Sequence, residues 1–210
     1  MRRIDRTARP ASLTGRAASP FVLLTALLAL PLAGCGSASP RVRLETPLGV
    51  IEVEVYPERA PVTAANFLHY ADEGLFAEAS FYRVVRLDNQ PDDEVRIEVV
   101  QGGVRRLPPE QRVPPIAHET TAATGLRHRD GTLSMARSRP GTASSEFFIC
   151  IGDQPELDFG GRRNPDGQGF AAFGRVVEGM AVVRLIQALE PDGGQYLREP
   201  VPITRATRVK

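Results

Sequence analysis

The sequence predicts a mainly β protein, a β-barrel or closed sheet with two capping helices. About eight short segments alternate apolar and polar residues or are continuously apolar, as strands do, and turn residues separate them. Two segments, residues 61–72 and 178–189, instead repeat apolar residues with a helical period. The chain has 210 residues, of which 42% are hydrophobic, enough for one well-packed core.

The N-terminal leader differs from the rest of the chain. It contains five arginines and one aspartate, followed by an apolar run from Phe21 to Leu32 that is too short to span a membrane. This arrangement is typical of a secretory signal peptide. The letters LAGC at residues 32–35 resemble the bacterial lipoprotein cleavage box, so we expect removal of residues 1–34 and lipidation of Cys35. An ordinary signal peptide with a coincidental cysteine is the alternative.

A tether of residues 35–40 is expected to precede one folded domain, residues 41–210. That domain is slightly acidic, which gives no support for nucleic-acid binding. The lipid anchor implies an exported protein on the periplasmic face of a bacterial cell envelope. Gly36 and Ser37 follow the cysteine, and the lack of an aspartate there weakly favours the outer membrane.

Local sequence features predict the strands, helices and loops of the domain. The first two strands surround a Pro-Leu-Gly turn, and the next two surround an acidic, proline-containing loop. The first helix begins at Pro61, since proline suits a first helical turn, and ends at Asp72, before Gly74. Residues 104–130 contain four prolines and are expected to form a loop. The strands are expected at about residues 41–45, 50–56, 80–86, 96–101, 131–136, 145–152, 170–177 and 202–209.

The third strand carries an unexpected charge. Side chains alternate along a strand, so Phe81, Arg83 and Val85 are expected to share one otherwise apolar face. An arginine there either serves a function or is a surface residue that snorkels to solvent or pairs with a carboxylate. By the same alternation, Val99 and Gln101 are expected to share a face of the next strand.

Common catalytic and metal-binding motifs are not recognisable. The three histidines lack partners at metal-ligand spacing. The serines near residue 145 lack a nucleophile motif, and the paired glycines lack the lysine of a phosphate loop. Cys150 lies in an apolar run and is expected to be a buried thiol, without a disulfide partner if Cys35 is lipidated. We therefore expect no metal site and no acid–base catalysis.

Six segments point to a family. In chain order they are FYRVV, QGG, GTLSMAR, SSEFFICIG, LDFGG and FAAFGRVVEGM. Together they make residues 41–210 resemble a cyclophilin-type peptidyl-prolyl cis-trans isomerase. The resemblance implies a closed eight-stranded antiparallel β-barrel capped by two α-helices, with an active groove outside the barrel wall. It also implies an enzyme that binds proline-containing peptides without a cofactor. With the leader, it suggests unfolded exported proteins as clients, and we expect a monomer.

The resemblance assigns roles to particular residues. Arg83, Gln101 and Phe148 match the catalytic arginine, the glutamine that holds the substrate backbone and the aromatic floor of the proline pocket. Because Phe147 and Phe148 are adjacent in a strand, one should fill the barrel and the other face the groove. A purely structural core position is the alternative for Phe148. The residues matched to substrate binding are Val99, Ala136, Leu157 and Phe170.

These residues suit the chemistry of X–Pro rotation. The barrier of about 18–20 kcal/mol arises because rotation breaks amide resonance. An arginine aimed at the proline nitrogen can donate hydrogen bonds that are strongest when the amide is twisted, which is transition-state stabilisation by fixed charges. The guanidinium suits this task because it is planar and always charged.

The groove also departs from the family pattern. Glu98 stands where an aromatic residue is usual and Glu156 where Trp or Phe is usual, so we expect a preference for basic peptides and weak binding of cyclosporin-like ligands. Arg137 replaces a common Asn, Glu146 replaces a common Gln, and Phe170 cannot supply the hydrogen bond of His or Tyr. The alternative function is a proline-peptide binding or scaffold module with little turnover. A generic holdase chaperone is a third possibility.

Overall fold

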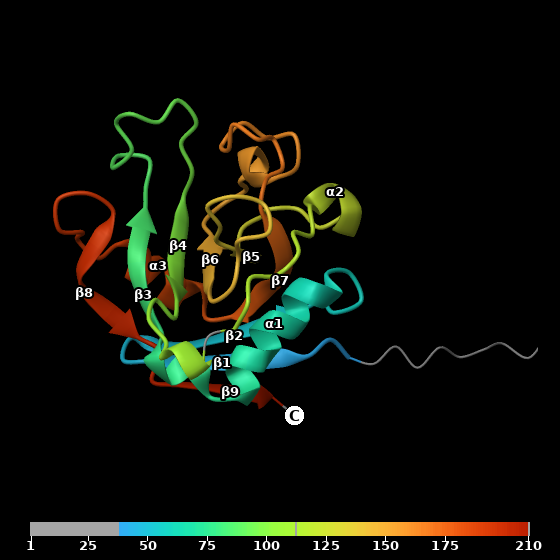
Figure 1. Cartoon of the computed structure of the whole chain (residues 1–210). Helices are drawn as coiled ribbons and strands as arrows, with labels where there is room; N and C mark the ends of the chain where they lie inside the picture. Colours follow the sequence, from blue (N-terminus) through green and yellow to red (C-terminus); the bar gives the residue numbers. More distant parts are fainter. Residues whose placement is uncertain (1–37, 112, 210) are drawn as a thin grey trace, which may run out of the picture. The chain divides into compact units, whose positions relative to one another are not determined.

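A computed structural model describes residues 38–111 and 113–209. Within them, one antiparallel sheet of nine strands curls around a hydrophobic core, in the order β8-β3-β4-β6-β5-β7-β2-β1-β9 (Figure 1). The strands are β1 (Arg41–Thr46), β2 (Gly49–Val55), β3 (Ser80–Val85), β4 (Val99–Gly103), β5 (Thr132–Met135), β6 (Glu146–Cys150), β7 (Ala171–Glu178), β8 (Tyr196–Pro202) and β9 (Arg205–Val209). The helices are α1 (Pro61–Asp72), α2 (Thr121–Thr124) and α3 (Met180–Gln187), with 3-10 turns at Leu75–Glu78, Pro109–Gln111 and Pro155–Leu157.

The predicted antiparallel, mainly β fold is confirmed, but the closed barrel of eight strands is not. The additional strand is β8, and its sequence YLREPVP contains two prolines and few apolar residues. Proline is tolerated there because β8 lies at one edge of the sheet, where β3 is its one neighbouring strand. The other edge strand, β9, follows β8 directly in the chain. Between them, the Ile203 and Thr204 N–H groups donate to the carbonyl oxygens of Ala79 and Glu45.

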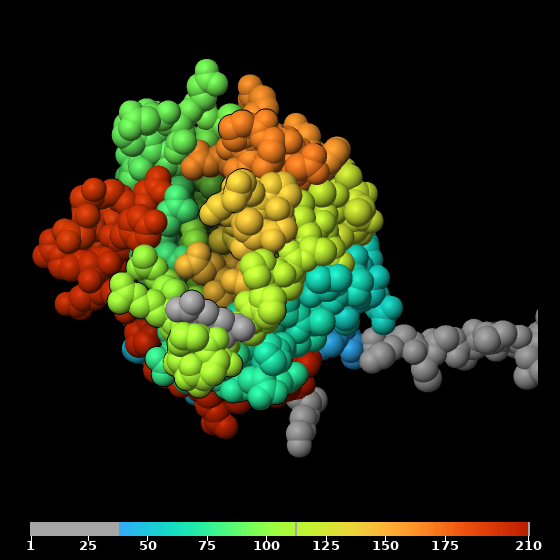
Figure 2. Space-filling model, viewed as in Figure 1, coloured from blue at the N-terminus to red at the C-terminus, as the bar shows by residue number. Residues whose placement is uncertain are grey.

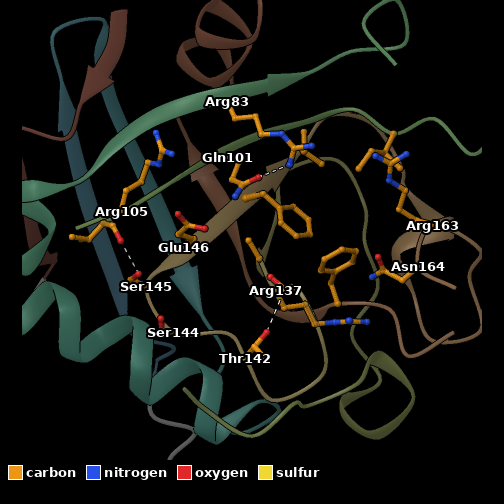
Figure 3. Close-up of a pocket in the computed structure, with 17 residues that line it drawn as sticks. Arg83, Gln101, Arg105, Arg137, Thr142, Ser144, Ser145, Glu146, Arg163 and Asn164 are labelled. Atoms are coloured by element: carbon orange, nitrogen blue, oxygen red, sulfur yellow. Dashed lines mark hydrogen bonds between the residues drawn. The ribbon is translucent and has the colours of Figure 1, made fainter. Parts of the chain in front are cut away.

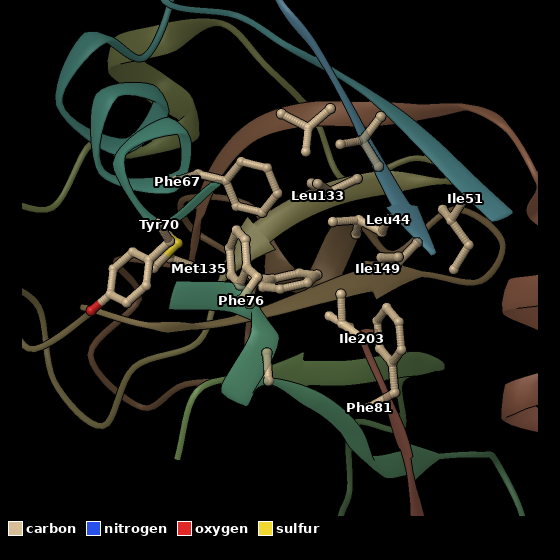
Figure 4. Close-up of a cluster of buried hydrophobic side chains, with 14 of the residues drawn as sticks. Leu44, Ile51, Phe67, Tyr70, Phe76, Phe81, Leu133, Met135, Ile149 and Ile203 are labelled. Atoms are coloured by element: carbon tan, nitrogen blue, oxygen red, sulfur yellow. The ribbon is translucent and has the colours of Figure 1, made fainter. Parts of the chain in front are cut away.

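The first helix matches its predicted bounds, Pro61–Asp72. Ala60, which precedes it, has no side chain that could cap the helix. Instead the Glu119 carboxylate accepts hydrogen bonds from the N–H groups of Val62 (3.2 Å) and Thr63 (2.8 Å). A negative charge at this end also complements the helix dipole. The helix packs Phe67 into the main core (Figure 4). The Phe67 ring meets that of Phe147 edge-on, with 5.4 Å between centroids.

A β-bulge in β3 determines which way the arginine points. The register with β4 shifts between Phe81, which lies opposite Gly102, and Arg83, which lies opposite Gln101. The extra residue, Tyr82, reverses the alternation of side chains. Phe81 is therefore wholly buried in the main core, whereas Arg83 faces the outer side of the sheet. The prediction that these two residues share a face is wrong, because an inserted residue changes the parity.

The expected signal peptide (residues 1–34), Cys35 and most of the tether lie outside the described residues. Among the helices that are described, none is both long and apolar enough to cross a membrane.

Candidate active site

A groove with a cavity of about 510 Å³ lies on the outer face of β3, β4 and β6. Figure 2 shows this face hollowed between the green and yellow segments. The groove brings together six of the seven predicted site residues, but Leu157 does not line it. Leu157 is wholly buried in an apolar cluster that also contains Val99 and Phe148, so it packs behind the groove floor. The six residues that line the cavity are Arg83, Val99, Gln101, Ala136, Phe148 and Phe170.

Strand register aligns the three residues predicted to be catalytic. Gln101 on β4 lies opposite Arg83 on β3 and opposite Phe148 on β6. Adjacent strands lie about 4.8 Å apart, so the three side chains form a row across the sheet. The predicted shared face of Val99 and Gln101 is confirmed, since both line the groove. The opposite orientations of Phe147 and Phe148 are confirmed too, because Phe147 belongs to the main core.

Two glutamine oxygens hold the Arg83 guanidinium. Nη1 donates to Oε1 of Gln101 at 2.7 Å, and Nε donates to Oε1 of Gln195 at 3.0 Å, an oxygen that also accepts from Nη2. Arg83 makes no ion pair with a carboxylate within residues 38–111 and 113–209. An arginine has five N–H groups, so two remain for a bound peptide.

The Gln101 amide is oriented by its neighbours. Its Nε2 donates to the Tyr82 hydroxyl at 2.7 Å, and its oxygen accepts from Arg83 (Figure 3). Burial and the nearby Glu146 carboxylate raise the pKa of Tyr82, so the phenol stays protonated at neutral pH. One N–H of the Gln101 amide is left for a substrate carbonyl. Sequence reasoning assigned a role to neither residue: Tyr82 lies in the matched segment FYRVV but had no role assigned, and Gln195 lies in none of the matched segments.

Aromatic and polar groups support the groove floor. The Phe148 ring stacks on His128, with centroids 6.0 Å apart and an 18° interplanar angle, and meets Phe170 edge-on at 5.2 Å. His128 in turn lies 2.8 Å from Oδ1 of Asp158 and 2.9 Å from Oγ of Ser134. Burial tends to raise the pKa of Asp158, but hydrogen bonds from His128 outweigh it and lower the pKa. Ser134 is wholly buried, so this Ser-His-Asp set supports the floor and is not an accessible nucleophile.

Arg137, a departure from the family pattern, anchors the loop that precedes β7. Its side chain is 1% exposed and makes a bidentate ion pair with Asp166 at 2.8 and 2.9 Å. Nε and Nη2 donate to the Gly169 carbonyl, and the guanidinium lies 5.1 Å from the centre of the Phe170 ring. These contacts hold the Phe170 ring in position.

The two acidic departures do not line the groove. Glu98 accepts a hydrogen bond from Gln187 of α3 at 3.4 Å. Glu156 pairs with Arg162, whose backbone and side-chain hydrogen bonds lower the pKa of Glu156. The charged residues that do line the groove are four arginines and one glutamate, so a preference for basic peptides has no structural basis. These residues are Arg83, Arg105, Arg137, Arg163 and Glu146.

Comparison with known proteins identifies the family. Residues 41–208 match the family model described as cyclophilin type peptidyl-prolyl cis-trans isomerase/CLD. The chain belongs to this family. The cyclophilin is 34% identical to peptidyl-prolyl cis-trans isomerase A of Dickeya dadantii, over 88% of this chain and 91% of that one. It is 32% identical to peptidyl-prolyl cis-trans isomerase B of Escherichia coli, over 77% and 92%.

Solved structures agree on the fold. The crystal structure of a Cryptosporidium parvum cyclophilin type peptidyl-prolyl cis-trans isomerase superimposes with a TM-score of 0.63 at 20% identity, covering 82% of this cyclophilin and 98% of that chain. The predicted enzyme class, a peptidyl-prolyl cis-trans isomerase, is confirmed by the family and the curated relatives. The family binds proline-containing peptides as substrates.

Proposed function

We propose that this cyclophilin accelerates X–Pro rotation because Arg83 stabilises the twisted amide. One observation carries the proposal: Arg83, Gln101 and Phe148 lie in a row across three paired strands, and the arginine has no carboxylate partner among the described residues. The guanidinium therefore keeps its positive charge and two N–H groups available for a bound peptide.

The aromatic and the polar side chains of the groove have different roles. The proline ring lies against Phe148 and Phe170, while the free N–H of Gln101 holds the backbone on the N-terminal side of the X–Pro amide and leaves the carbonyl of that amide free to turn. With the ring and the preceding backbone held, rotation is confined to the X–Pro bond. Arg83 donates to the proline nitrogen as it becomes pyramidal and regains a lone pair. A fixed donor that acts only in the transition state is worth about 3 kcal/mol, or about a hundredfold in rate.

Measurement of cis/trans interconversion tests the role of Arg83. In a protease-coupled assay with an Ala-Ala-Pro-Phe substrate, we expect Arg83→Ala to lose about a hundredfold in rate and to keep its unfolding midpoint. Arg162→Ala is the matched control, because Arg162 is an exposed arginine that pairs with Glu156. Equal rates for wild type and Arg83→Ala would contradict the proposal. A wild type that binds the peptide without accelerating its rotation would favour the alternative, a binding or scaffold module.

We further propose that the enzyme is exported and anchored through lipid on Cys35, as a monomer that acts on unfolded exported proteins. The arginine-rich leader, its apolar run and the LAGC box support this localisation. Labelling with radioactive palmitate in a bacterial host tests it. We expect label on the wild type and none on Cys35→Ser, whereas label that persists on Cys35→Ser would contradict the anchor.

A further inference from the structure

A second glutamine contacts Arg83 from the side opposite Gln101. Gln195 comes from the loop between α3 and β8, next to Tyr196, the first residue of β8. Its single oxygen Oε1 accepts from both Nε and Nη2 of Arg83, while Gln101 accepts from Nη1. Each of the three guanidinium nitrogens therefore has one partner.

The position of Gln195 is itself fixed. Its backbone carbonyl accepts from the Val84 N–H at 2.8 Å, which ties it to β3. Its side-chain Nε2 donates to the backbone carbonyl of Asn89 at 3.1 Å. Asn89 in turn donates from Nδ2 to the Val84 carbonyl at 3.0 Å and accepts from the Arg86 N–H at 2.8 Å. The oxygen that meets Arg83 is thus attached to the strand that carries Arg83.

Asn89 belongs to the loop between β3 and β4, residues 86–98, and this loop is held together by hydrogen bonds within it. Gln90 is 2% exposed, and its Nε2 donates to the carbonyls of Arg86 (2.7 Å) and Ile97 (2.8 Å). Its Oε1 accepts from the Ile97 N–H at 3.2 Å. Arg163 connects the loop to the segment before β7, through Val95 at 2.7 Å and Asp93 at 2.9 Å. Figure 1 shows the two segments rising at the same end of the sheet.

We propose that Gln195 is a positioning residue for Arg83, and that the loop between β3 and β4 serves the active site by holding Gln195 in place. The proposal rests on the proposed role of Arg83. An arginine side chain loses about 2 kcal/mol of rotamer entropy when it is fixed. A single bond to Gln101 leaves the guanidinium plane free to turn about that contact. A second acceptor on the Nε/Nη2 edge fixes the plane before substrate binds, which is the preorganisation that catalysis by fixed charges requires.

The proposal predicts a particular kinetic pattern. Gln195 does not line the groove, so its loss leaves peptide binding unchanged and affects the rotation step. Misplacement of a catalytic group by about 1 Å can cost about a hundredfold in rate. We expect Gln195→Ala and Gln195→Met to lower kcat roughly tenfold to a hundredfold, with KM within about twofold of wild type. Met has nearly the length of Gln but offers no comparable acceptor, and both variants keep the backbone bond to Val84.

The experiment combines NMR exchange spectroscopy on an Ala-Ala-Pro-Ala peptide with the ¹H–¹⁵N signal of the Arg83 Nε–H group. Gln187→Ala is the matched control, since Gln187 is a partly buried glutamine of α3 whose side-chain Nε2 donates to Glu98 and makes no contact with Arg83 among the described residues. The expected result is a lower kcat and a displaced or rapidly exchanging Arg83 Nε–H signal in both Gln195 variants. The Gln187 control should match wild type in both measurements.

The outcomes separate this proposal from the one on which it rests. Wild-type activity in Arg83→Ala would overturn the proposed role of Arg83 itself. A slow Arg83→Ala beside fully active Gln195 variants would overturn only the positioning role. A raised KM with unchanged kcat in the Gln195 variants, or an unshifted Arg83 Nε–H signal, would also overturn it.

Discussion

Arg137 lines the groove, yet its removal should destabilise the domain much more than removal of an exposed arginine would. Arg137→Ala deletes two hydrogen bonds to the Gly169 carbonyl, the ion pair with Asp166 and the contact with the Phe170 ring. The side chain is 1% exposed, so water cannot readily replace these contacts.

The expected cost follows from two contributions. Charged hydrogen bonds to a carbonyl that is otherwise left unpaired contribute about 1.5–3 kcal/mol. A desolvated guanidinium over an aromatic ring contributes about 1–2 kcal/mol. We assign no energy to the ion pair, because the Asp166 carboxylate is well exposed. The sum is about 2.5–5 kcal/mol, which lowers Tm by roughly 10 °C in a domain of this size.

Urea denaturation followed by circular dichroism measures this difference. Asp166→Asn removes only the ion pair and should cost much less than Arg137→Ala. Arg139→Ala, in the same loop and exposed, should stay within about 0.5 kcal/mol of wild type. Because Phe170 moves with its loop, Arg137→Ala should also raise KM for the peptide. If Arg137→Ala and Asp166→Asn lose equal stability, the bonds to Gly169 do not act as described.

Three further predictions concern pH, backbone and charge. Because the folded Asp158 has a lowered pKa, its carboxylate contributes stability that is complete above about pH 4 and is lost as pH falls through the folded pKa. Asp158→Asn should therefore flatten the loss of stability below about pH 4, and an unchanged slope in acid denaturation would contradict this. Gly103 has φ +130°, and an added Cβ would overlap the Ser145 carbonyl, so Gly103→Ala should cost at least about 2 kcal/mol in thermal unfolding. Gly141→Ala, at φ +77° with open space around it, should cost only about 1–2 kcal/mol; equal losses would show that φ alone matters. Peptides with an acidic residue beside the proline should bind the arginine-lined groove a few fold more tightly than basic ones, with a difference that shrinks in salt, and a titration at low salt that ranks them equally would disprove this.

Local sequence signals predicted the first helix and most strands. The helix bounds were correct because Pro61 and Gly74 act through their own backbone preferences. The bulge at Tyr82 escaped prediction, since alternation along a strand cannot reveal an inserted residue. The edge strand β8 escaped as well, because its prolines argue against a strand until its place in the sheet is known.

The site residues were recognised through short segments that resemble a family. The residues that hold them in place were not recognised. Arg83 and Gln195 are 112 positions apart in the chain, and His128 and Asp158 are 30 apart. No local pattern connects such pairs, so their contacts emerge only when the sheet brings distant loops together. The role of Arg137 was missed for the same reason, because its partners lie in a loop 29 to 32 residues further on.

The pairing of β1 with β9 places Arg41 opposite Val209, so the two ends of the folded domain lie side by side. A circular permutant that joins these ends through a short linker and opens elsewhere should keep its hydrogen-bonded ladder. For the same reason, the whole domain could be inserted into a surface loop of a host protein without separating the two residues between which it is inserted.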